Sequence, residues 1–182
     1  MEQELINEFS SLRDEVFEAL RRGTYSKSHG VARVLRYLML PSFHNPVSWD
    51  VVRSSSNSNN GVFSLVRTCW RMDLDGWEFE SPIRRLRHPR PFKPTIEVDC
   101  VPLEAVQIET KIASFQTIHA PFFPTSIGMC LDGTLFELTI GNSYCNTRVA
   151  WCCTMPAEWR KMSNFINEMA QLFEDAWASR DQ

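Results

Sequence analysis

The segment 81–94, SPIRRLRHPRPFKP, is locally basic and could bind an anion. Its four prolines prevent regular backbone hydrogen bonding, so we expect a loop that crosses the surface. Such a loop either presents its guanidinium groups to a partner or nucleic acid, or is solvated and pairs with acidic residues upstream. On a chain of net charge −3 we favour the solvated loop. Its candidate partner-binding residues are Arg84, Arg85, Arg87, Arg90 and Lys93.

Carboxylates precede this segment at spacings that suit a turn better than a metal site. Asp73, Asp75 and Gly76 resemble a turn, whereas a calcium loop needs further oxygen ligands at set spacings and a later glycine. Glu78 and Glu80 repeat the i,i+2 spacing, which is typical of solvated surface. We therefore expect no calcium here.

The cysteines and histidines form no recognisable metal or catalytic motif. No CxxC pair occurs, and the four histidines do not complete a zinc pattern. Cys145 and His119 could form a dyad only if the fold brought them together. Nucleophile elbows, glycine-rich phosphate loops, HExxH and kinase signatures are absent too. We therefore expect no metal and no cofactor, and we favour a non-catalytic protein over an enzyme.

Cysteine usage and composition predict a cytoplasmic globular chain. In a reducing compartment the six cysteines would be small buried hydrophobes, and the neighbours Cys152 and Cys153 would point to opposite faces of a regular strand. No apolar run is long enough for a membrane span, and the acidic N-terminus lacks a secretory signal. At 182 residues we expect one domain, 1–182.

The N-terminal half predicts two helices followed by strands. Residues 3–22 form an amphipathic helix that ends at Gly23, and residues 31–40 a second helix, although this short run also fits a strand. Trp49 to Val52 begins the sheet. Ser54–Gly61 is a flexible loop, which joins two strands of a hairpin rather than two domains. A central strand then covers 62–72.

The C-terminal half predicts a hairpin, a third strand and a helix. Ile96 and Val98 point inward from a short strand, and Pro102 opens a helix to about Thr117. Asp132-Gly133 suits a type I′ turn between strands at 126–131 and 134–140. Its mixed face carries Glu137 and Thr139, which makes that face, with the basic loop, the best place to look for a site. Residues 148–153 form the third strand, and a helix capped by Thr154 runs to Trp177.

This element order predicts an α+β fold. We expect a mainly antiparallel sheet of about five or six strands, covered by N-terminal, middle and C-terminal helices.

The C-terminal half resembles a group of bacterial proteins without an assigned activity. The resemblance lies in the runs LDGTLFELTIG, RVAWCC and MPAEW and in the upstream FESPIRRLRHPRPFKPTIEV, and it covers about residues 66 to 175. Phe136 stands where these proteins have Tyr, and Trp151-Cys152 where they have two Trp. The resemblance implies the same fold and transfers no activity.

Three functional hypotheses follow. The first is a cytoplasmic protein-binding module of immunity or inhibitor type, favoured by small size, acidic balance and the lack of a catalytic motif. The second is a small enzyme whose site carries no known motif. The third is a weak anion or nucleic-acid binder that uses Arg84 to Lys93.

Overall fold

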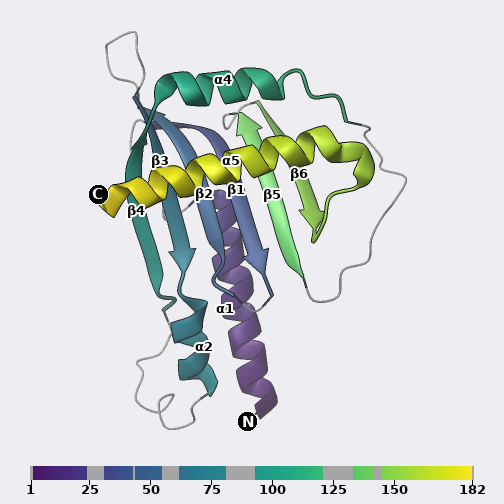
Figure 1. Cartoon of the computed structure of the whole chain (residues 1–182). Coiled ribbons are helices and arrows are strands. Elements are labelled where there is room, and N and C mark those ends of the chain that lie inside the picture. Colours follow the sequence, from purple (N-terminus) through teal and green to yellow (C-terminus); the bar gives the residue numbers. More distant parts are fainter. Residues whose placement is uncertain are drawn as a thin grey trace.

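A computed structural model describes residues 2–23, 31–42, 44–54, 62–80, 93–120, 133–141 and 145–181. The elements follow the chain order α1, β1, β2, β3, α2, β4, α4, β5, β6 and α5 (Figure 1). Their bounds are α1 Glu2–Arg22, β1 Val31–Pro41, β2 Val47–Ser54, β3 Val62–Trp70, α2 Met72–Glu80, β4 Ile96–Leu103, α4 Ala105–Phe115, β5 Thr134–Gly141, β6 Asn146–Cys152 and α5 Arg160–Ala178. Single 3₁₀ turns flank α5 at Ala157–Trp159 and Ser179–Asp181.

The strands form one six-stranded sheet in the order β4-β3-β2-β1-β5-β6. Every neighbouring pair is antiparallel. The α+β prediction is therefore confirmed, with six strands. None of the helices in the described ranges is long and apolar enough to cross a membrane.

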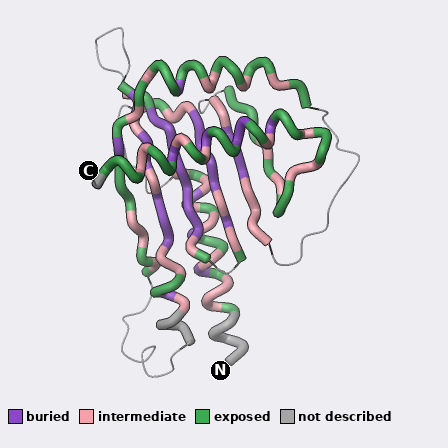
Figure 2. Tube along the Cα trace, in the orientation of Figure 1, coloured by how far each residue is buried: buried purple, intermediate pink, exposed green. Residues whose placement is uncertain are grey.

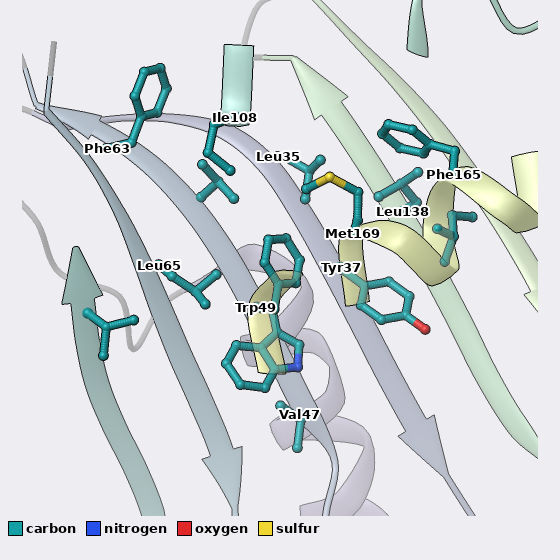
Figure 3. Packing of buried hydrophobic residues seen from close by; sticks show 14 of the residues in the cluster. Leu35, Tyr37, Val47, Trp49, Phe63, Leu65, Ile108, Leu138, Phe165 and Met169 are labelled. Atoms are coloured by element: carbon teal, nitrogen blue, oxygen red, sulfur yellow. The ribbon is translucent and has the colours of Figure 1, made fainter. Parts of the chain in front are cut away.

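Helices cover both faces of the sheet, and each face has its own core. On the α5 face, aromatic and aliphatic side chains of β1, β2 and β3 pack against α4 and α5. Trp49 of β2, Ile108 of α4 and Met169 of α5 belong to this core (Figure 3). On the other face Val16 and Leu20 of α1 pack against Leu38 and Trp70. Burial is greatest in the interior strands and least in β6 (Figure 2).

The run 31–40 is a strand, so the helix predicted there is wrong. Leu35 and Tyr37 belong to the α5-face core, whereas Leu38 and Leu40 belong to the α1-face core. A strand buried on both faces carries apolar residues at consecutive positions, which hides the period of two. The shortness of the apolar run favoured a strand and was a better indicator than its apparent helical period.

The hairpin predicted at Asp132-Gly133 is also wrong. Residues 126–132 lie outside the described residues, but β5 pairs with β1 along one side and with β6 along the other. Both sides of β5 are therefore occupied, and it cannot pair with the segment just before it. The third strand is confirmed as β6.

Other boundaries differ from the prediction by local chemistry. The turn expected at 73–76 is part of α2, and Pro102 lies within the edge strand β4 rather than opening a helix. An edge strand tolerates proline because half of its N–H groups have no ladder partner. Val98 is 44% exposed, not inward. Thr154 caps no helix, because α5 begins at Arg160 after a 3₁₀ turn. Residues 55–61 of the predicted loop lie outside the described residues.

Candidate functional site

The basic loop predicted to bind a partner lies mostly outside the described residues. Arg84, Arg85, Arg87 and Arg90 lie outside the described residues, and Lys93 is exposed just before β4. Their partner-binding role stays a prediction. His119 and Cys145 are both exposed, after α4 and just before β6, and their pairing as a dyad stays a prediction too.

The mixed face with Glu137 and Thr139 is the sheet face that α1 covers, and it carries a row of polar residues. Asp50, Arg36, Thr139 and Arg148 are cross-strand neighbours on β2, β1, β5 and β6. Side chains at directly paired positions point to the same face and can interact. The row therefore brings polar and charged groups together from residues 9 to 112 positions apart in the chain.

At the centre of this row Arg36 and Asp50 form a buried ion pair. Their side chains are 2% and 1% exposed, and Arg36 donates Nε to Oδ1 at 2.7 Å and Nη2 to Oδ2 at 2.9 Å. Ser48 Oγ donates to the same carboxylate at 3.2 Å. Arg36 Nη1 also donates to the backbone carbonyl of Arg21, in the last turn of α1. The pair is thus fully hydrogen-bonded and fixes the end of α1 to the sheet.

A second carboxylate, Glu137, lies beside this pair and receives two guanidinium groups. Arg148 Nη2 donates to Glu137 Oε2 at 2.6 Å, and Arg21 Nε lies 3.5 Å from the same oxygen. The Glu137 side chain is 5% exposed, while Arg148 reaches solvent at 56%. Arg21 also donates to Glu18 at 2.7 Å on the surface of α1, and this hydrogen bond lowers the pKa of Glu18.

A β-bulge adds Arg33 to the group. The register of β1 on β2 shifts between Arg33 and Leu35, so Arg33 pairs with Val52 and lies on the same face as Arg36. Burial lowers the pKa of Arg33, and repulsion from Arg36 adds to the effect. Its Nε is buried and has no hydrogen-bond acceptor in the described part of the chain. Together Arg21, Arg33, Arg36, Arg148, Asp50 and Glu137 form what we call the arginine cluster.

Asp73 and Asp75 of α2 are already engaged by neighbouring groups. Asp75 is buried and accepts from Trp70 Nε1 at 2.5 Å, and from the backbone N–H and the hydroxyl of Thr95 at 2.8 and 2.7 Å. Arg71 donates to Asp73 and lowers the pKa of that carboxyl to about 2. Asp75 therefore joins α2 to the start of β4. Among the described residues, no three His, Cys, Asp or Glu side chains lie close enough to hold a metal ion.

The cysteines depart from the prediction of small buried hydrophobes. Cys69 is buried, but Cys100, Cys145 and Cys152 are exposed, and Cys153 is disulfide-bonded. Cys153 also follows the strand at φ 59°, so the regular alternation expected for the 152–153 pair does not apply, and the two sulfur atoms lie 3.9 Å apart. Burial raises the pKa of the Cys69 thiol.

The two edge strands differ in how their outer sides are protected. β4 carries Glu97 and Asp99, which ion-pair with Arg71 and Arg180, and also Pro102. β6 has the sequence NTRVAWC, with one charged residue and no proline or glycine. Charged residues and proline are the usual means by which edge strands avoid pairing with other chains. In the described part of the chain, β6 hydrogen-bonds on one side only and lacks most of this protection.

No protein-family model, no curated protein and no solved structure matches this chain. We therefore infer function from the arginine cluster and from the edges of the sheet.

Proposed function

We propose that the chain is a non-catalytic protein-binding module of immunity or inhibitor type, which pairs β6 with an extended segment of a partner polypeptide. The observation that carries this proposal is the weakly protected edge of β6. In strand addition, backbone hydrogen bonds supply affinity and alternate side chains supply specificity. β4 is the less suitable edge, because Glu97, Asp99 and Pro102 oppose such pairing.

The side chains around β6 indicate which residue types a partner segment would need. On the α1 face Arg148 lies next to Arg21, so an incoming strand would place acidic residues there. On the α5 face Trp151 stacks on Phe136 with ring centroids 5.4 Å apart, so apolar residues suit that side. Because side chains alternate along a strand, the fitting segment alternates acidic and apolar residues. This pattern gives the partner a recognisable chemistry.

A bacterial, cytoplasmic setting is part of the proposal. The resemblance of the C-terminal half supports the bacterial origin, and the exposed thiols of Cys100 and Cys152 suit a reducing compartment. The disulfide at Cys153 instead suits an oxidising one. Labelling the thiols in intact cells before lysis decides between the reducing and the oxidising compartment. In the cytoplasm Cys153 would be reduced and would react with the label, whereas a disulfide-bonded Cys153 would not.

Site-specific photo-crosslinking tests the strand pairing. Ala150 on β6 and Val98 on β4 are both exposed and occupy the same cross-strand row at opposite edges of the sheet. We expect a photo-reactive residue at position 150, and not at position 98, to capture one discrete protein in the native host. The purified captured protein should then slow hydrogen exchange of the β6 amides. Equal capture from both edges, or no protection of β6, would contradict the proposal.

A further inference from the structure

The arginine cluster carries more positive charge than its carboxylates neutralise. Asp50 neutralises Arg36, but Glu137 is shared between Arg21 and Arg148, and no carboxylate bonds to Arg33 in the described part of the chain. At the surface Glu18 pairs with Arg21 and with the exposed Arg22. Five guanidinium groups therefore face three carboxylates, on a chain whose net charge is −3. The local surplus of two positive charges runs against the charge of the whole molecule.

Two of these guanidinium groups also have a buried Nε that forms no hydrogen bond in the described part of the chain, namely those of Arg33 and Arg21. The Arg21 Nε lies 3.5 Å from Glu137 Oε2, which is an ion pair without a hydrogen bond. Buried donors are nearly always hydrogen-bonded in native proteins, because an unsatisfied donor loses its hydration without replacement. Packing alone is a poor explanation for Arg33, since a β-bulge places it on this face, and bulges often redirect a side chain toward a functional site.

We propose that Arg33, Arg21 and Arg148 form a binding site for a phosphate group, either free or carried by a larger molecule. A phosphate group carries about −1.5 to −2 charges at neutral pH, which matches the surplus, and offers three strong acceptor oxygens. Guanidinium groups bind such oxygens with two parallel N–H donors, so each unsatisfied Nε would gain an acceptor. Arg36 takes no part in this contact, because its donors are used by Asp50 and the Arg21 carbonyl. The site does not depend on the strand pairing proposed above.

The first test is a titration of the purified full-length chain with inorganic phosphate. Binding is monitored through the Nε–Hε signals of the arginines in NMR spectra. We expect the signals of Arg33 and Arg21 to shift and saturate with phosphate, and not with chloride at equal ionic strength. A phosphoserine peptide is titrated in parallel. Binding of the peptide at least tenfold tighter than phosphate assigns a phosphorylated polypeptide as the ligand, and equal binding assigns the free anion.

Matched variants show whether the named residues hold the anion. Arg33→Ala should weaken phosphate binding at least tenfold. The control Arg53→Ala removes an exposed arginine of β2 that lies over the ring of Phe63 on β3, and it should leave phosphate binding unchanged. Arg148→Gln on the exposed side of β6 is a second variant in case Arg33→Ala does not fold. Phosphate shifts no larger than those of chloride, or equal losses in the Arg53 control and the cluster variants, would overturn the proposal.

Discussion

The Arg36–Asp50 ion pair joins strands β1 and β2 to the C-terminal end of α1. Both side chains are almost fully buried, and the guanidinium also reaches the last turn of α1. Burying two charges costs hydration, and this cost is offset because all three guanidinium nitrogens and both carboxylate oxygens form hydrogen bonds. Removing one partner leaves the other charged, buried and unpaired.

Asp50→Ala should therefore lower the free energy of unfolding by about 3–5 kcal/mol. The matched control is Asp99→Ala, whose carboxylate pairs with Arg180 at 3.2 Å with both side chains substantially exposed. Exposed ion pairs contribute about 0–1 kcal/mol, so the control should change little. Urea unfolding followed by tryptophan fluorescence measures both. Equal losses for the two variants would show that the buried pair adds nothing beyond a surface contact.

Among the elements, β1 and β5 show what the sequence could and could not reveal. The apolar stripe along residues 3–22, the charges at both ends and the following Gly23 predicted α1 correctly. A surface helix can be predicted in this way because its apolar period is visible in its own residues. β1 was misjudged because it is buried on both faces. The hairpin before β5 was misjudged because Asp-Gly is a local signal, whereas the strand order that occupies both sides of β5 is set by distant β1.

The same limit applies to the candidate site. Glu137 and Thr139 were identified as a promising mixed face, and the structure places both in or beside the arginine cluster. Arg36 and Asp50 were missed, although charged residues inside the apolar runs 31–40 and 47–52 were the available signal. Arg33 reaches the cluster only because of the β-bulge in β1, and Arg21 only because α1 packs on this face of the sheet. Neither the bulge nor the packing of α1 can be predicted from residue spacing in the sequence.

The C-terminal end of α1 lies close against the guanidinium of Arg36. Gly23 follows the helix at φ +70°, and a Cβ built there would lie 2.0 Å from Nη2 of Arg36. A side chain would therefore strain the backbone and displace the buried guanidinium. Gly76 is the matched control, because it lies within α2 with no atom within 4 Å of a built Cβ.

We expect opposite signs for the two alanine variants. Gly23→Ala should destabilise the fold by at least about 1–2 kcal/mol, the usual cost of left-handed backbone for a residue with a side chain. Gly76→Ala should stabilise it by about 0.5–1 kcal/mol, because alanine loses less backbone entropy in a helix. Paired thermal and urea unfolding measure both changes. A stabilised Gly23→Ala variant would mean that Arg36 does not approach the helix end this closely.

At the scale of the whole molecule, the sheet separates two different cores. On the α5 face the core is apolar and aromatic, with Trp49 packed against Phe173 and Trp177 at centroid distances of 6.0 and 5.5 Å. The α1 face combines an apolar group around Trp70 with the arginine cluster. The interior strands β1 and β3 contribute side chains to both cores, whereas β6 lies at one edge of the sheet. Local stability should therefore fall from the centre of the sheet toward β6.

Native-state hydrogen exchange of the isolated chain should show this gradient. Amides of β1 and β2 should exchange only on global unfolding, and those of β6 at least tenfold faster, because β6 hydrogen-bonds on one side among the described strands and is largely exposed. The measurement is repeated at two protein concentrations tenfold apart. Protection of β6 that grows with concentration would show that a second copy of the chain occupies this edge. Protection equal to β2 at both concentrations would show that the edge is closed within the chain, and the partner segment would then have no strand to join.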